Sequence, residues 1–248
     1  MTQCGGEYKV SLITVRTMNL SLDPMKNEIL TQEHWDEEYQ ATDVAWDTHR
    51  PHSELQRVVN YLSLEPCRLL EIGCGTGSDA VWLASRGFDV TGVDLSAVAI
   101  DEARQRASAA GVEVDFRVAD VREKGAVDGT FDFFFDSGCY CALRNTDGKG
   151  YRGAIHSLTR SGGLGLVLTG NAIEPQQSLG PSVVSEKDIR SEWREGFLIK
   201  DLREFRFDPR HPGEQRFLGW SCLLQRHSDA AAFAWKSTIA DGRGGCWK

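Results

Sequence analysis

The sequence predicts an α/β fold in which helices cover both faces of a mostly parallel, doubly wound sheet. Short apolar stretches of strand length alternate along the chain with stretches that have helical spacing. The strand candidates are apolar throughout, which is typical of strands buried on both faces of a parallel sheet. Glycines cluster after the first strand, where open α/β sheets bind their ligands. The length of 248 residues suits one such domain.

The first predicted elements surround the glycine cluster. Ser53–Leu62 has apolar residues on one helical face, so we expect a helix there, capped by Ser53. Arg68–Ile72 is mainly apolar and predicts a strand that ends at the glycines of 73–77. A second helix is expected over Ser78–Ser85. This order, helix, strand, glycine loop and helix, begins the alternating pattern.

The strand–helix pattern then repeats once and is followed by a third strand. Gly87 ends the preceding helix, and Phe88–Val93 predicts the second strand. A helix is expected to open at Ser96 and to run to about Ala110. The next strand is predicted over Val114–Val118.

The rest of the chain adds four strands and two helices. The expected strands are Phe131–Phe135, Leu164–Thr169, Phe197–Phe205 and Arg216–Gln225, and the expected helices are Gly150–Leu158 and 185–195. A turn that contains prolines and a glycine joins the last two strands, which predicts an antiparallel C-terminal hairpin. The sheet therefore has seven predicted strands.

The charge narrows the classes of partner. Lysine and arginine number 28 and aspartate and glutamate number 36, so the formal net charge is −8. Binding to nucleic acid or to anionic lipid through a broad basic face needs the opposite balance. No stretch approaches the roughly 20 apolar residues that span a bilayer. We expect a small-molecule partner, no nucleic acid and no membrane, and the sequence leaves the oligomeric state open.

The cysteines predict free thiols. Their number, seven, is odd, and no two form a CxxC pair. This usage favours a reducing compartment, and we expect a cytoplasmic protein without a metal site. Cys139 and Cys141 are interpreted as small residues in a turn between a strand and a loop.

The glycine loop is followed by acids at successive strand ends. A dinucleotide fingerprint would place glycines at 73, 75 and 78, but residue 78 is Ser78, which weakens a nicotinamide-cofactor interpretation. Asp94 lies seventeen residues after Gly77, and Asp120 and Asp136 follow the third and fourth strands. A single such acid is often a turn or helix-cap residue, but the joint arrangement favours a ligand site.

The run LLEIGCGTG at residues 69–77 resembles the first motif of the class I S-adenosylmethionine-dependent methyltransferases. The resemblance implies a Rossmann-like fold and S-adenosyl-L-methionine as cofactor. It implies that Asp94, with Leu95 beside it, holds the two ribose hydroxyls, and that Asp120 and the Val121 amide contact the adenine. The loop itself contributes Glu71, Gly73, Gly75 and Gly77 to the cofactor-binding set.

The N-terminal segment resembles the thiopurine S-methyltransferase-like group and related small thiol methyltransferases. It has Trp35 and Trp46 eleven positions apart, in a segment that folds over the cofactor in that group. The alternative is that both tryptophans only pin the segment to the core. We expect an ill-ordered extension over 1–24, a methyltransferase domain over 25–226 with a lid at 25–65, and a C-terminal tail over 227–248.

The resemblance predicts an enzyme, and the reaction we expect is methylation of the sulfur in a small thiol or sulfide. O- or N-methylation of a small metabolite, or a cofactor-binding homologue without turnover, are the alternatives. Asp136 and Tyr140 are the predicted catalytic residues, and His49 and His52 are further candidates for a base. The thiopurine enzymes tend to have Asp-Arg where this chain has Asp-Ser at 136–137. The candidate substitutes for the missing arginine are Arg50, Arg144, Arg206 and Arg210.

Overall fold

The computed structural model describes residues 31–40, 44, 46–176 and 180–228. The predicted extension at 1–24 lies outside the described residues, and of the predicted tail at 227–248 only residues 227 and 228 are described. Within these residues no helix is both long enough and apolar enough to cross a membrane.

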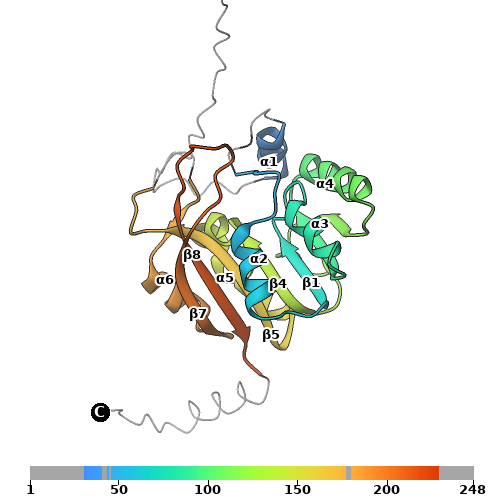
Figure 1. Ribbon diagram of the computed structural model, residues 1–248. Coiled ribbons are helices and arrows are strands. Elements are labelled where there is room, and N and C mark those ends of the chain that lie inside the picture. Colours follow the sequence, from blue (N-terminus) through green and yellow to red (C-terminus); the bar gives the residue numbers. More distant parts are fainter. Residues whose placement is uncertain (1–30, 41–43, 45, 177–179, 229–248) are drawn as a thin grey trace, which may run out of the picture.

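A mixed sheet forms the centre of the molecule, as predicted (Figure 1). Its strands are β1 (Arg68–Ile72), β2 (Asp89–Asp94), β3 (Asp115–Val118), β4 (Phe131–Ser137), β5 (Thr159–Asn171), β7 (Phe197–Arg206) and β8 (Leu218–Arg226). They lie in the order β3-β2-β1-β4-β5-β8-β7, and the two-residue β6 (Val183–Val184) adds to β5. The first five run parallel, and β8 is antiparallel to both β5 and β7. The order reverses between β1 and β4.

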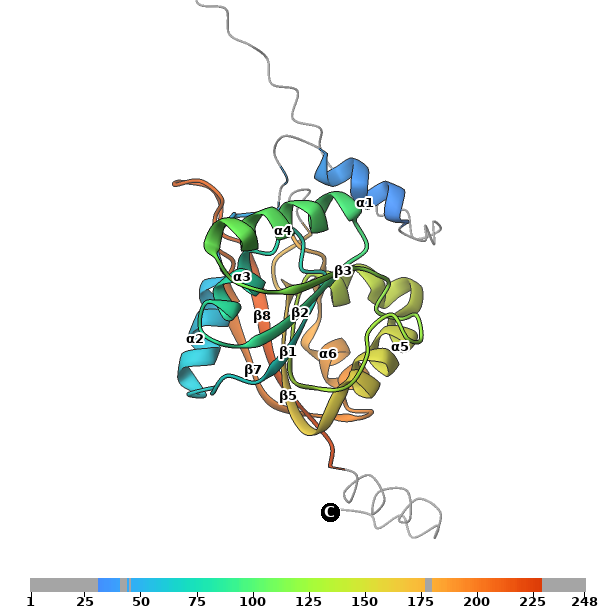
Figure 2. The ribbon, with the colours of Figure 1, turned by 90° about the vertical axis from the view of Figure 1, so that its right-hand side faces the viewer.

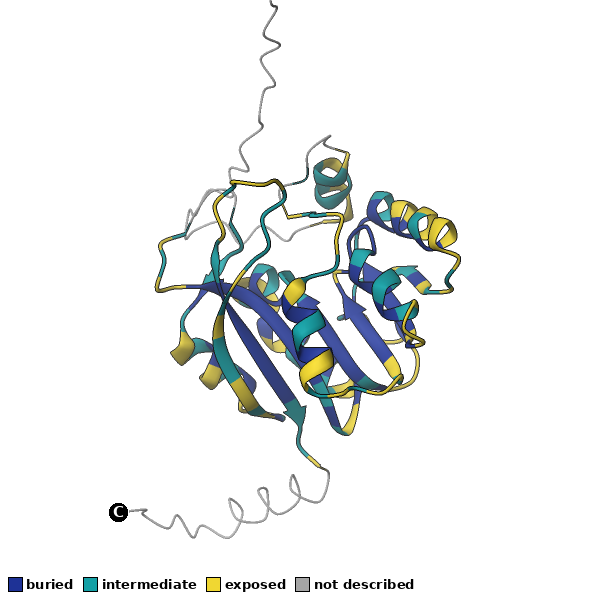
Figure 3. Ribbon diagram, viewed as in Figure 1, coloured by how far each residue is buried: buried dark blue, intermediate teal, exposed yellow. Residues whose placement is uncertain are grey.

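Helices cover both faces of the sheet (Figure 2). The helices α2 (Ser53–Tyr61), α3 (Ser78–Ala84) and α4 (Ala97–Ala110) pack on one face, and α5 (Cys139–Leu158) and α6 (Glu186–Trp193) pack on the other. In the burial view the central strands are dark blue, and the helices α2, α3 and α4 carry both buried and exposed residues (Figure 3). Continuous burial of the central strands explains their uninterrupted apolar sequence.

Several predicted elements needed correction. The helix expected at Gly150–Leu158 begins at Cys139, so Cys139 and Cys141 lie in its first turn; it is kinked at Asp147, whose backbone is not helical. The helix α1 (Gln32–Tyr39) was not predicted. Ser53 does not cap α2, because it is the first helical residue and His52 is the cap.

Candidate active site

The glycine loop lies directly after β1 and is shaped by left-handed backbone. Gly73, Gly75 and Gly77 have φ values of +64°, +51° and +78°, a region that glycine enters without strain. A Cβ on Gly75 would lie 2.7 Å from the hydroxyl oxygen of Tyr39. A Cβ on Gly77 would instead meet Ala103 of α4 at 2.8 Å. The loop therefore has one glycine under the N-terminal segment and one against α4.

A cavity of about 470 Å³ opens beside this loop. It lies at the carboxyl ends of β1, β2 and β4, where the strand order reverses, which is the binding position of open α/β sheets. Its volume is in the range of small-molecule sites. Nine of the ten predicted cofactor-binding residues line it: Trp35, Trp46, Glu71, Gly73, Gly75, Asp94, Leu95, Asp120 and Val121. The tenth, Gly77, packs against α4 and is not among the lining residues.

Asp94 joins the glycine loop to α4. Its Oδ2 accepts the backbone N–H of Gly75 and its Oδ1 accepts that of Ser96, both at 2.9 Å. Burial raises the pKa of this carboxyl, while the backbone hydrogen bonds, those from Ser96 and Gly75 foremost, oppose the rise. Each carboxylate oxygen has a second lone pair, so two acceptor positions remain for a ligand. This is the capacity that two ribose hydroxyls would need.

Two further acids differ in their surroundings. Asp120 forms an ion pair with Arg122, Oδ2 to Nη2 at 2.6 Å, and hydrogen bonds from that side chain lower the pKa of Asp120. Glu71 is buried beneath the loop, and burial, followed by the charges of Asp79 and Asp94, raises the pKa of Glu71 well above its usual value. The surroundings of Asp120 thus favour its ionised form, whereas those of Glu71 favour its neutral form.

Aromatic side chains from the N-terminal segment border the cavity. The ring of Trp46 contacts the rings of Trp35 and Tyr39 edge to face, at 5.7 Å in each case, and its Nε1–H donates to the Tyr39 hydroxyl at 3.1 Å. Asp36 anchors α1 to the start of α4, accepting from the Ser96 hydroxyl at 2.6 Å. Sequence reasoning missed Tyr39, although it lies one helical turn after Trp35 on the same face of α1.

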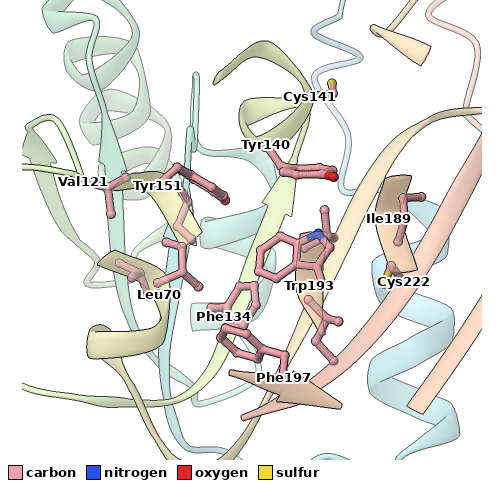
Figure 4. Close-up of a cluster of buried hydrophobic side chains, with 14 of the residues drawn as sticks. Leu70, Val121, Phe134, Tyr140, Cys141, Tyr151, Ile189, Trp193, Phe197 and Cys222 are labelled. Atoms are coloured by element: carbon pink, nitrogen blue, oxygen red, sulfur yellow. The ribbon is translucent and has the colours of Figure 1, made fainter. Parts of the chain in front are cut away.

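The two predicted catalytic side chains do not lie in the cavity. Asp136 is fully buried; it accepts the hydroxyl of Tyr151 and, at 2.9 Å, the backbone N–H of Tyr140. Burial raises the pKa of Asp136 to about 7. The hydroxyl of Tyr140 donates to Glu192, and its ring packs against the rings of Tyr151 and Trp193 (Figure 4). We therefore assign both side chains to the core under α5 and not to the chemistry.

The physical reason is the alternation of side chains along β4. Successive strand residues point to opposite faces, so Asp136 shares the face of Phe134, which α5 and α6 cover. Ser137 shares the face of Phe135, and it lines the cavity. The period of two was visible in the sequence and could have directed attention to Ser137.

A hydrogen-bonded chain that the sequence did not indicate borders the cavity near Ser137. Nδ1 of His52 lies 2.7 Å from Oδ2 of Asp79, and its Nε2 lies 3.2 Å from the Ser137 hydroxyl. All three side chains line the cavity. His52 was one of four candidate bases, but Asp79, 27 residues away, could not be paired with it from spacing.

The four candidate arginines divide into two pairs. Arg144 and Arg206 do not line the cavity; they pair with Glu192 and Glu174. The other two, Arg50 and Arg210, line it.

One cluster in the described part of the chain has donor atoms close enough to hold a metal ion. Asp47, His49 and Glu102 each offer an atom, and these atoms lie within 4.8 Å of one another. The guanidinium of Arg106 lies 3.1 Å from Nδ1 of His49 and 3.5 Å from Glu102. A cation already present among these groups disfavours a metal ion there.

Comparisons with known proteins agree with this geometry. The family described as thiopurine S-methyltransferase matches residues 30–217. The 2-heptyl-1-hydroxyquinolin-4(1H)-one methyltransferase of Mycobacteroides abscessus is 28% identical over 202 residues, 74% of this chain and 88% of that protein. "Probable thiol methyltransferase 2" of Arabidopsis thaliana is 30% identical over 116 residues, 44% of this chain and 49% of that protein.

Solved structures share the fold. One, described as "Conversion of a Disulfide Bond into a Thioacetal Group during Echinomycin Biosynthesis", has a TM-score of 0.67 and 25% identity, and the match covers 85% of this chain and 99% of that chain. The 1,6-didemethyltoxoflavin-N1-methyltransferase of Burkholderia thailandensis, bound to S-adenosylhomocysteine, has a TM-score of 0.62 and 21% identity over 79% of this chain and 87% of that chain.

Proposed function

The chain belongs to the thiopurine S-methyltransferase family and is an S-adenosylmethionine-dependent methyltransferase, and from this premise we propose that it methylates the sulfur of a small, uncharged thiol. The single observation that carries the choice of acceptor is the composition of the cavity beyond the glycine loop. Its apolar part includes Phe207, Phe217 and Pro181.

The cavity residues fit the cofactor. Gly75 leaves no room for a side chain beneath Tyr39, and Asp94 keeps two acceptor positions open beside it. We assign Asp94 to the ribose hydroxyls, and Asp120 with the Val121 amide to the adenine. Trp35 and Trp46 offer ring faces and edges beside a cationic sulfonium. When bound, S-adenosylmethionine supplies an electrophilic methyl group on sulfur.

The arginines of the cavity support an uncharged acceptor. Arg50 donates from Nη2 to the carbonyl oxygen of Pro209 at 2.6 Å. Arg210 donates to the carbonyl oxygen of Val44 at 3.3 Å and lies 3.6 Å from Glu214. Both guanidinium groups thus connect the segment before α2 with the loop between β7 and β8. A carboxylate on the acceptor would have to compete with these bonds.

Sulfur is the preferred acceptor atom for chemical reasons. A thiol with a pKa near 8.5 ionises far more readily than an aliphatic alcohol, and its thiolate is a strong nucleophile. Methyl transfer then needs alignment and exclusion of water more than strong base catalysis. The name of the family and that of the Arabidopsis relative point to the same atom.

A hydroxyl on a heteroaromatic ring is the second candidate acceptor. The observation that favours it is the mycobacterial relative, which matches across 88% of its own length and is named for a hydroxyquinolone. Such an acceptor would carry no charge, and its ring would suit the apolar part of the cavity.

Methylation of a matched acceptor panel tests the proposal. The wild-type protein is incubated with labelled S-adenosylmethionine and, in turn, an uncharged alkyl or aryl thiol, its carboxylated analogue and a hydroxylated heteroaromatic. We expect the uncharged thiol to have a kcat/KM at least tenfold above that of the carboxylated thiol. Faster turnover of the carboxylated thiol, or product from the hydroxyl compound alone, would contradict the assignment. Binding without product from any acceptor would favour the homologue without turnover.

We propose that the protein works in the cytoplasm on a small-molecule partner, without nucleic acid. Among the described residues five cysteines are free thiols, which suits a reducing compartment. The net charge of −8 disfavours polyanionic partners.

A further inference from the structure

Three side chains from three parts of the fold form a directed hydrogen-bonded chain at the cavity. His52 precedes α2, Asp79 lies in the first turn of α3, and Ser137 is the last residue of β4. An ionised carboxylate only accepts, so Nδ1 of His52, 2.7 Å from Asp79, carries the ring proton. The lone pair of the neutral ring is then on Nε2, which faces the Ser137 hydroxyl at 3.2 Å.

The imidazole ring is held rigidly. Oδ1 of Asp79 also accepts the backbone N–H of His52 at 2.8 Å, so one carboxylate fixes both the main chain and the ring. The ring meets Phe135 edge to face at 6.0 Å. Its side chain is 19% exposed, which leaves it accessible from the cavity. A carboxylate that bonds one ring nitrogen and so fixes the tautomer is a common arrangement around a histidine base.

Nε2 also lies where the fold brings reacting groups together. Ser137 ends β4, the neighbour of β1 at the point where the strand order reverses. The glycine loop follows β1 at the same edge of the sheet. A donor methyl bound by this loop and an acceptor in the apolar part of the cavity meet at this edge.

We propose that His52, oriented by Asp79, is the catalytic residue that takes the proton from the methyl acceptor. The inference rests on the proposed function and applies to any acceptor with a proton on its reacting atom. The acceptor's S–H bond breaks, the proton moves to Nε2, and the electron pair stays on sulfur. That pair forms the new bond to the methyl carbon while the methyl–sulfonium bond breaks and its pair remains on the departing sulfur. The imidazolium, paired with Asp79, returns the proton to water.

The same three residues do not form a nucleophilic serine site. Such a site needs free backbone N–H groups to hold an oxyanion. The Gly138 N–H donates to the carbonyl oxygen of Leu168 at 3.2 Å, and the Tyr140 N–H donates to Asp136. The Cys139 N–H is also engaged by Asp136. The amides after Ser137 are therefore occupied, and Ser137 serves as a hydroxyl partner of Nε2.

The charges around His52 determine its pH dependence. Burial alone would lower the pKa of His52, but the charge and hydrogen bond of Asp79, with smaller effects of Asp208 and Asp47, raise it overall. These acids face the ring from α3, from the loop after β7 and from the segment before α2, and β4 contributes only uncharged Ser137 and Phe135. The base is active when neutral, so kcat/KM falls as the pH drops through this raised pKa.

Acceptors of different acidity test the role of His52. We compare wild type and His52→Ala on a weakly acidic alkanethiol and on an aromatic thiol that is already ionised at the assay pH. Loss of a general base typically costs on the order of 10²- to 10⁴-fold. We expect a loss of this size in kcat/KM for the alkanethiol and less than a fivefold loss for the ionised thiol. His227→Ala, a histidine beyond the end of β8 and outside the cavity, is the matched control.

A second variant separates base catalysis from structure. Asp79→Asn removes the charge and leaves one acceptor oxygen, which can serve the ring N–H or the backbone N–H of His52 but not both. In the molecules that keep the ring contact, loss of the charge shifts the acid limb of the pH profile to lower pH. Melting temperature and S-adenosylhomocysteine affinity are measured for each variant to establish that it folds. Equal losses for both thiols, or no loss for either, would overturn the role of His52.

Failure of the proposed function gives a different result. If the wild type methylates hydroxyl compounds and no thiol, the choice of sulfur is wrong. The same comparison between weakly and strongly acidic hydroxyl compounds then decides the role of His52: a selective loss on the weakly acidic compound supports it, and an equal loss on both overturns it.

Discussion

Replacement of Asp94 by asparagine tests the centre of the cofactor site. The carboxylate accepts the backbone N–H groups of Gly75 and Ser96, each at 2.9 Å, through different oxygens. Asparagine has nearly the same shape but only one acceptor oxygen. Its NH₂ group must therefore face one of the two N–H groups, and one buried donor loses its partner.

The size of the effect follows from these bonds. A buried N–H without an acceptor costs about 1–3 kcal/mol. Because burial raises the pKa of Asp94, the charged form carries a desolvation cost that the neutral amide avoids. We therefore expect the free energy of unfolding to fall by about 1–2 kcal/mol, the lower part of that range. The amide also removes one acceptor for a ribose hydroxyl, and S-adenosylhomocysteine should bind roughly 5- to 150-fold more weakly.

Calorimetric titration and urea unfolding measure the two effects separately. Asp89→Asn is the matched control, because Asp89 starts the same strand at the opposite edge of the sheet and its side chain is 75% exposed. We expect this control to match the wild type in both measurements. An Asp94→Asn protein that binds S-adenosylhomocysteine within twofold of wild type would refute the assignment of Asp94 to the ribose.

Three further substitutions probe the neighbourhood of the loop. The pKa of Glu71 is raised in the folded protein, so its contribution to stability is present below its unfolded pKa and is lost as the pH rises through its folded pKa. Glu71→Gln should therefore flatten the fall in melting temperature as the pH rises above the unfolded pKa of a glutamate. Gly75→Ala should destabilise the fold by about 1–2 kcal/mol for left-handed backbone and weaken cofactor binding. In the control Gly111→Ala, where φ is +67° and no atom lies within 4 Å of the added Cβ, only the stability should fall. Equal losses of cofactor affinity in the two variants would contradict the predicted contact between Gly75 and the cofactor. Asp36→Ala should lower the free energy of unfolding by about 0.5–2 kcal/mol, because the start of α4 loses an acceptor. Glu37 is exposed, so Glu37→Ala should change this free energy very little in the same denaturation assay. Identical values for the two variants would show that the contact of Asp36 with α4 has no effect on stability.

Much of the fold was predictable because its signals are local. The run from Leu69 to Gly77 combines an apolar strand, a glycine loop and a helix start within nine residues, and the structure follows that order. The start of α5 was missed for a local reason as well. Its cap is Gly138, which has no side chain to mark the helix end, and its kink at Asp147 interrupts the helical pattern.

The site could be predicted only where a residue's position follows from the residues next to it in the sequence. Asp94 and Asp120 follow their strands directly, so their place beside the cavity could be expected. The contact between His52 and Asp79 joins the residue before α2 to the first turn of α3, and spacing in the sequence does not reveal it. Asp136 misled the prediction because its position at a strand end was noted and its face of the strand was not.

The clasp between Arg50 and Pro209 has a consequence for folding. The two residues are 159 positions apart, and the bonded segments close the cavity from opposite ends of the described chain. The two segments can thus meet only after the chain has been made as far as Pro209, late in synthesis and across a long loop. A nascent chain that lacks its last strands would contain the glycine loop and the parallel strands but no closed binding site. Ligand-dependent protection from proteolysis would then report that the chain extends past Pro209, because no part of it that ends earlier contains both halves of the clasp.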